Sequence, residues 1–143
     1  MSDSLVVYAT LFASSFLAAT ILPLASEPVL FATVLAGYPL WLTTVVVTIG
    51  NVLGGCTTYW LARRGAELLE RRGVTAIDDS RAGRLVRRFG QPAMLLSWVP
   101  LVGDALVAVA GAVRMPFFPF LVWLSIGKAA RYLIVAWSAA ALR

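Results

Sequence analysis

The stretch Leu22–Asn51, LPLASEPVLFATVLAGYPLWLTTVVVTIGN, decides the fold, because its pattern returns later in the chain. Its one charged residue is Glu27, and no other charge occurs between Ser4 and Ala62. A displacement of 77 positions lays this stretch without a gap over residues 99–128, VPLVGDALVAVAGAVRMPFFPFLVWLSIGK. A single carboxylate therefore recurs at the same place in two apolar segments.

The residues that support this alignment belong to scarce types. Apolar matches carry little weight, because 60% of the chain is hydrophobic, whereas prolines, acids and tryptophans are few. The alignment pairs Pro23 with Pro100, Glu27 with Asp104, Pro39 with Pro116, Gly50 with Gly127 and Trp60 with Trp137. We therefore interpret the chain as two copies of one structural unit.

The uncharged segments are long enough to cross a membrane. Only 13% of the residues are charged, about half of the proportion in a soluble domain. A helix needs about 20 apolar residues to cross the hydrocarbon core, and the uncharged runs Ser4–Ser26 and Pro28–Ala62 both exceed this length. We expect an all-α integral membrane protein.

Each unit reads as a break in the chain, a short helix and a long helix. The breaks lie at Pro23 and Pro100. A second proline opens each long helix, at a position where its missing N–H costs nothing. The long helices are expected over Pro39–Arg63 and Pro116–Leu142, and both are long enough to span a bilayer.

The short helices are too short to cross. Val29–Gly37 and Ala105–Val113 have nine residues each, which cover about 14 Å, or half of a bilayer. We expect each break to turn inside the membrane and to return to its side of entry as a re-entrant loop. Backbone groups at such a turn must be bonded within protein or in a wet cavity.

The charged residues are concentrated between the two units. Residues 63–88 hold eight arginines against four acids, whereas residues 1–62 hold only Asp3 and Glu27. Short arginine-rich loops stay in the cytoplasm under the positive-inside rule, so we expect a cytoplasmic loop. The long helices then run in opposite directions, and the units form an inverted repeat like those of many secondary transporters.

The domain organisation that follows is a single multi-pass membrane domain. The first repeat covers about residues 5–63, the cytoplasmic amphipathic loop residues 63–88, and the second repeat about residues 89–142.

The loop itself predicts two short surface helices, of which Gly73 ends the first. Leu85, Val86 and Phe89 are expected in the membrane interface, and the loop arginines either face anionic headgroups or only fix the topology. Their confinement to one loop of a membrane protein argues against nucleic-acid binding.

Two basic residues of the last helix, Lys128 and Arg131, fall at membrane depth on one helical face. Charges at that depth cost about 3 kcal/mol each and normally face a partner or a cavity. In the functional interpretation, Glu27 and Asp104 are proton-coupling or gating residues, and Lys128 and Arg131 bind a substrate phosphate. In the alternative, these four residues form ion pairs that only lock the two units together.

Arg114 adds a third cation near the end of the second short helix. With it, the membrane-embedded set counts three bases against two acids, a surplus that suits an anion such as a lipid phosphate. The alternative is that the Arg114 side chain only snorkels to the membrane surface.

Missing residue types exclude several activities. The chain has no histidine and one cysteine, Cys56, so we expect no metal site, no cofactor and no enzyme, because no nucleophile has an evident base. Gly50 and Gly54, with Gly127 in the second unit, are expected to let helices pack closely.

The chain contains the stretches FLAATILPLASEPVL, GNVLGGCTTYWLAR, SWVPLVGDALVAVAGAVRMPFFPF and GKAARYLIVA. Together they resemble the DedA superfamily, also called the VTT or SNARE-associated membrane proteins, and most closely its small YqaA-like members. The resemblance implies a protein of the bacterial inner membrane with two opposed re-entrant loops. It further implies movement of a lipid between leaflets, either undecaprenyl phosphate or a phospholipid, with the proton-motive force as an energy source in some members.

The resemblance also assigns residues. Glu27 matches the acid that the family requires, and Arg114 matches its basic residue before Met-Pro. Larger members carry arginines beside the proline of the second re-entrant loop. This chain departs from them with Ser97, Trp98, Gly103 and Asp104. The departure suggests that the cationic role has moved to Lys128 and Arg131.

The expected function is therefore translocation of an anionic lipid between leaflets, with proton coupling left open. The alternatives are a small proton-coupled ion or solute antiporter and a non-catalytic membrane-organising protein. The expected partners are lipids with anionic headgroups. A second copy of the chain is a further candidate, because 143 residues are few for enclosing a lipid-sized path.

Overall fold

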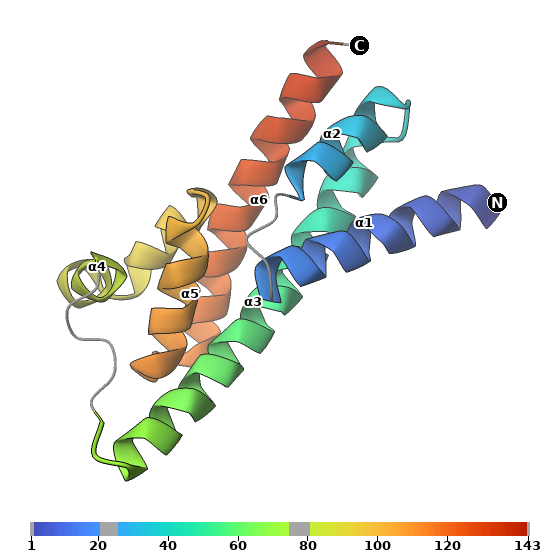
Figure 1. Cartoon of the computed structure of the whole chain (residues 1–143). Coiled ribbons are helices and arrows are strands. Elements are labelled where there is room, and N and C mark those ends of the chain that lie inside the picture. Colours follow the sequence, from blue (N-terminus) through green and yellow to red (C-terminus); the bar gives the residue numbers. More distant parts are fainter. Residues whose placement is uncertain (1, 21–25, 75–80, 143) are drawn as a thin grey trace.

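A computed structural model describes residues 2–20, 26–74 and 81–142 of the chain (Figure 1). Within these ranges the secondary structure is helical throughout. The elements are α1 (Ser2–Thr20), α2 (Glu27–Leu35), α3 (Leu40–Arg71), α4 (Arg81–Phe89), the 3₁₀ helix η1 (Gln91–Trp98), α5 (Val102–Ala112) and α6 (Phe117–Ala141). Three of them, α1, α3 and α6, are long and apolar enough to cross a membrane, which confirms the all-helical membrane fold.

The two units keep the register of the sequence alignment. We call α2 with α3 the first unit and α5 with α6 the second unit. The helix ends Leu35 and Ala112, and the helix starts Leu40 and Phe117, both lie 77 positions apart. Pro39 and Pro116 stand just before the long helices as N-cap residues rather than inside the first turn.

The turn between the short and the long helix is also the same in both units. Its backbone hydrogen bonds follow the Schellman pattern, which satisfies the last carbonyls of a helix. They are Tyr38 N–H to Thr33 O (3.3 Å), Gly37 N–H to Val34 O (3.0 Å), Met115 N–H to Ala110 O (2.9 Å) and Arg114 N–H to Gly111 O (3.0 Å). The two units therefore make the same backbone hydrogen bonds at this turn.

The first long helix extends beyond its predicted end at Arg63 and stops only at Arg71. The segment after Arg63 is rich in good helix formers, and Glu67 pairs with Arg63 one turn earlier at 3.7 Å. The first of the two predicted surface helices is thus the end of α3. Gly73 follows it with a φ of 73°.

The two units interlock, because each short helix packs mainly against the long helix of the other unit. Helix α2 lies along α6, and α5 lies along α3. The long helices α3 and α6 run in opposite directions (Figure 1). Two hydrophobic clusters result, one around Tyr59, Leu106 and Phe120 and one around Leu11, Leu30 and Tyr132.

Helix α4 packs on the second unit rather than standing free. Ala82 and Val86 are buried in the cluster around Leu106, so Val86 lies in the protein core and the interfacial position expected for it is wrong. Leu85 packs against the same cluster, whereas Phe89 is exposed.

The break of the second unit is a γ-turn centred on Leu101, which has a φ of 64° and a ψ of −52°. The N–H of Val102 donates to the carbonyl of Pro100 at 2.7 Å. Such a turn is rare and strained for a residue with a side chain. The corresponding break at Pro23 lies outside the described residues.

Three glycines mark close helix contacts. A Cβ at Gly50 would meet the carbonyl oxygen of Phe12 in α1 at 2.7 Å, and one at Gly127 would meet Ser97 Oγ of η1 at 2.5 Å. A Cβ at Gly54 would lie closer still to a carbonyl oxygen of α1, that of Phe16. In each unit the long helix thus presents glycine to the element that precedes the break.

Candidate functional site

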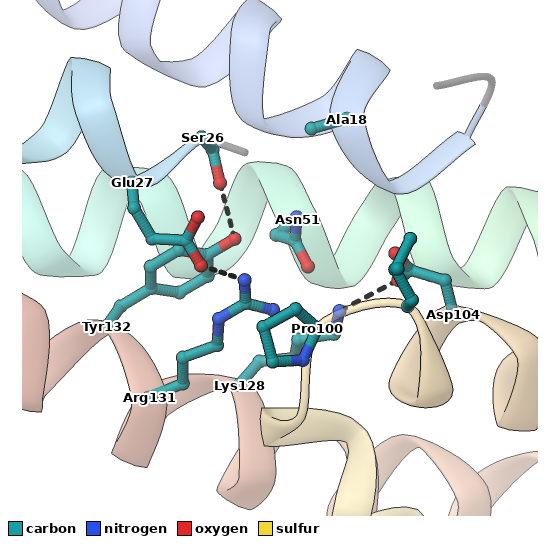
Figure 2. A pocket seen from close by; sticks show the side chains of 10 residues that line it. Ala18, Ser26, Glu27, Asn51, Pro100, Asp104, Lys128, Arg131 and Tyr132 are labelled. Carbon is teal, nitrogen blue, oxygen red and sulfur yellow. Dashed lines mark hydrogen bonds and ion pairs between the residues drawn. The ribbon is translucent and has the colours of Figure 1, made fainter. Parts of the chain in front are cut away.

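The two acids of the repeat lie at the starts of the short helices. Glu27 is the first residue of α2, and Asp104 lies in the first turn of α5. Carboxylates at helix N-termini are favoured by the helix dipole. Although 77 positions separate them in the sequence, both side chains line one cavity (Figure 2).

Asp104 forms an ion pair with Lys128 of α6. The Lys128 Nζ lies 3.1 Å from Asp104 Oδ1, and the two side chains are 1% and 33% exposed. The ammonium is therefore buried, while the carboxylate retains access to the surroundings. Because of this asymmetry, loss of the ion pair costs more free energy for the buried Lys128 than for Asp104.

Glu27 forms the second ion pair, with Arg131 one turn further along α6. Arg131 Nη2 contacts Glu27 Oε1, and the side chains are 13% and 23% exposed. Both predicted acids are thus neutralised by the two predicted cations of α6. The pairs are Glu27–Arg131 and Asp104–Lys128, an assignment that the sequence left open.

A hydroxyl pair joins the first unit to the second beside Glu27. The side chains of Ser26 and Tyr132 share a hydrogen bond of 2.6 Å, and both are buried. Neither residue was predicted to belong to the site. Their positions in the sequence could have indicated that they belong to the site, because Ser26 directly precedes Glu27 and Tyr132 directly follows Arg131.

A cavity of about 60 Å³ lies between the two ion pairs. Figure 2 shows the Asn51 side chain above it, between the Glu27–Arg131 pair and the Asp104–Lys128 pair. The lining residues are Ala18, Ser26, Glu27, Asn51, Pro100, Leu101, Asp104, Lys128, Arg131 and Tyr132. The site is thus built from α1, from the starts of α2 and α5, from the break of the second unit and from both long helices.

Arg114 does not belong to this cavity. Its guanidinium pairs with Glu70 of the extended α3 at 2.6 Å, and both side chains are about half exposed. Its backbone has a φ of 57°, in the left-handed region where the first unit has Gly37. Without Arg114, the cavity holds two acids and two bases, so the cation surplus expected from the sequence is absent from this cavity.

The site has no donor set typical of a metal centre. Among the described residues, no three histidine, cysteine, aspartate or glutamate side chains gather. Cys56 lies in α3 and packs against the cluster around Leu106. What the site does offer is two cations, Lys128 and Arg131, each paired with a carboxylate.

These features define a helical membrane protein with a charged cavity between two interlocked structural units. Comparison with known proteins gives the family. The VTT domain matches residues 22–140 of the chain. The inner membrane protein YqaA of Escherichia coli (strain K12) is 42% identical over 138 residues, which cover 95% of this chain and 92% of YqaA.

Further relatives agree with this match. The inner membrane protein YqaA of Shigella flexneri shows the same identity and coverage. An uncharacterized protein of Haemophilus influenzae is 35% identical over 132 residues, 85% of this chain and 80% of the relative. No solved structure matches the chain. The chain belongs to the VTT-domain, or DedA, family of membrane proteins, and its fold is consistent with a membrane transporter.

Proposed function

We propose that this protein translocates an anionic lipid between the leaflets of the bacterial inner membrane. The observation that carries the proposal is the meeting of four charged side chains around one cavity, contributed by both units. Charged residues inside a membrane domain are costly and rarely kept without a role. Glu27 and Asp104 act as gating and proton-coupling residues, and Lys128 and Arg131 bind the headgroup phosphate.

The two units form an inverted repeat in which α2 and α5 are the arms of re-entrant loops. Their lengths of 9 and 11 residues are short of a membrane span, and the antiparallel α3 and α6 support this arrangement (Figure 1). The arginine-rich segment 63–88 faces the cytoplasm under the positive-inside rule. In such repeats the substrate site lies near the midplane at the breaks.

Headgroup binding requires the carboxylates to give up their partners. Lys128 and Arg131 are each paired with an acid, so a phosphate binds them only after a carboxylate has left. A proton on Glu27 or Asp104 removes the negative charge that holds the cation. Proton uptake and phosphate binding are therefore thermodynamically linked at one site. Rocking of one unit against the other then exposes the cavity to either leaflet.

An apolar groove supports a lipid as the substrate. It has a volume of about 300 Å³ and lies between α3 and α6. Ala129 and Ala130 line it, and they stand in the sequence between Lys128 and Arg131. The groove thus lies at the same depth as the ion pairs, where an acyl or polyprenyl chain stays in contact with the protein while its headgroup crosses. Its lining residues are Trp41, Thr44, Val45, Thr48, Ile49, Ala129, Ala130 and Leu133.

The test is leaflet exchange in liposomes that contain the purified protein. Fluorescent phospholipid and polyprenyl phosphate are compared in the wild type, in Glu27→Gln, and in Glu70→Gln as a matched control. Glu70 is an exposed partner of Arg114 away from the cavity. We expect exchange in the wild type and in Glu70→Gln and its loss in Glu27→Gln. Full exchange in a folded Glu27→Gln protein would show that Glu27 has no role in translocation.

A second candidate function is a proton-coupled antiporter of a small ion. The cavity volume of about 60 Å³ favours it, since this space takes a few small molecules rather than a headgroup. The two functions separate in the same liposomes. An antiporter dissipates an imposed pH gradient when its ion is added and leaves both fluorescent lipids in place.

A further inference from the structure

The amide oxygen of Asn51 is a buried acceptor without a protein partner. The Asn51 side chain is 3% exposed, and its Nδ2 donates to the carbonyl of Ser15 at 3.1 Å. That bond fixes the orientation of the amide. Its Oδ1 receives no hydrogen bond from any residue that the structure describes. A buried acceptor left in this state costs stability unless water or a ligand supplies a donor.

This oxygen faces the charged cavity. Asn51 lines the cavity together with both ion pairs. Figure 2 shows its oxygen turned toward the side where the Arg131 and Lys128 side chains lie. Asn51 also occupies the position in the first unit that Lys128 occupies in the second, 77 residues later. The unpartnered acceptor therefore stands between the two pairs.

The cavity also contains hydrogen-bond donors in excess. Lys128 has three N–H groups, and within the described chain it makes one hydrogen bond, to Asp104. Arg131 has five, and its bond within the described chain goes to Glu27. A water molecule accepts from such donors and in turn donates to Asn51 Oδ1.

The volume is sufficient for water. A cavity needs about 10–15 Å³ of space accessible to the centre of a water molecule to hold one, and this cavity has about 60 Å³, enough for several. Buried waters need two to four polar partners. The four charged side chains and Asn51 supply them around this space.

We propose that the cavity is a water site anchored by Asn51 Oδ1, and that its water joins the two ion pairs into one hydrogen-bonded network. Asn51 is a positioning residue in this network. The polar residues that line the cavity are Ser26, Glu27 from α2, Asn51 from α3, Asp104 from α5, and Lys128, Arg131 and Tyr132 from α6. This inference stands without the lipid translocation proposed above.

The network gives a proton a path between the two units. When a carboxyl oxygen of Glu27 carries a proton, that O–H bond breaks as the proton moves to the bridging water. The water gives one of its own protons to Asp104, where a new O–H bond forms, and the water is regenerated. No further reactant is needed.

The test is X-ray hydroxyl-radical footprinting of the protein in detergent, because radicals formed from bound water label the side chains next to it. Tyr132 and Tyr59 are matched reporters, since both are at most 1% exposed. Tyr132 lines the cavity, whereas Tyr59 is enclosed by Trp60, Phe117 and Phe120. We expect Tyr132 to be labelled severalfold faster than Tyr59.

The role of Asn51 is tested by Asn51→Leu, which removes the acceptor and fills its space. Thr58→Val is the control, because Thr58 Oγ1 also donates from α3 to a carbonyl of α1, that of Ala19, at 2.8 Å. We expect Tyr132 labelling to fall to the Tyr59 rate in Asn51→Leu and to stay at the wild-type rate in Thr58→Val. Should Asn51→Leu not fold, the smaller Asn51→Val serves in its place.

Two results overturn the inference. Equal labelling of Tyr132 and Tyr59 in the wild type means that the cavity is dry. Wild-type labelling of Tyr132 in folded Asn51→Leu or Asn51→Val means that the water does not depend on Asn51.

Discussion

The first and the second unit share a backbone but not their charges. Both place an acid at the start of the short helix, Glu27 or Asp104, and both make the same turn before the long helix. Where α3 has Asn51 and Gly54, however, α6 has Lys128 and Arg131 at the corresponding positions. Among the described residues that line the cavity, both cations therefore come from the second unit.

The elements that precede the two breaks explain this difference. In the first unit, the long helix α1 approaches α3 so closely that a Cβ at Gly54 would contact the carbonyl of Phe16. In the second unit, the preceding element is the eight-residue η1, and Arg131 reaches Glu27 instead. Close packing at Gly54 leaves no room for a large side chain on α3, so the cations among the described residues that line the cavity lie on α6.

The largest expected effect comes from breaking the pair of the second unit. Asp104→Leu leaves the buried Lys128 ammonium without a partner, and we expect a loss of about 3 kcal/mol in the free energy of unfolding. Lys128→Met should cost less, because Asp104 is 33% exposed and finds water. Unfolding in bicelles measures both. An equal or greater loss for Lys128→Met contradicts this ranking.

The second-largest loss of stability is expected from substitutions at the glycine contacts of both units. Gly50→Ala and Gly127→Ala insert a methyl group against backbone carbonyls or Ser97, and overpacking of this kind costs about 1–3 kcal/mol. Gly65→Ala is the control, because nothing lies within 4 Å of the added Cβ, and alanine raises helix stability there by up to about 1 kcal/mol. Thermal unfolding in detergent compares the three. Stability of Gly127→Ala at or above that of the wild type would refute the close contact with η1.

The smallest effect is expected at the turn, where the first unit has Gly37 and the second Arg114. Arg114→Gly relieves a left-handed conformation that costs about 1–2 kcal/mol. The same substitution removes a half-exposed ion pair worth about 1 kcal/mol or less. Glycine is also more flexible in the unfolded chain, which lowers the stability of the folded protein. We expect a net change within about 1 kcal/mol, measured by the same thermal unfolding. A loss of several kcal/mol would mean that the Arg114–Glu70 pair holds α3 and the second unit together.

Much of this arrangement was predictable from residue types. Prolines, acids and glycines at a constant displacement of 77 positions predicted the two units, the long helices opening at Pro39 and Pro116, and an acid, Glu27 or Asp104, next to each break. These features are local, because a proline or a half-bilayer length acts through the chain next to it.

The parts that could not be predicted depend on packing between distant segments. The choice of Arg131 for Glu27 and of Lys128 for Asp104 follows from the interlocking of α2 with α6 and of α5 with α3. Arg114 was grouped with the site by its charge and by its match to the family's basic residue before Met-Pro, whereas the extension of α3 brings Glu70 to it. That extension was missed because Arg63 and Arg64 resemble a membrane boundary, although helices continue past such boundaries.

The most direct measurement is leaflet exchange by the double variant Asp104→Leu, Lys128→Met. Replacing both members of a buried ion pair by apolar residues is often neutral or stabilising, so we expect a folded protein with wild-type stability. If the pairs form a transport site, this variant leaves fluorescent phospholipid and polyprenyl phosphate in their original leaflets, while the wild type exchanges one of them. Exchange at the wild-type rate in the folded double variant would show that the pair only locks the two units together.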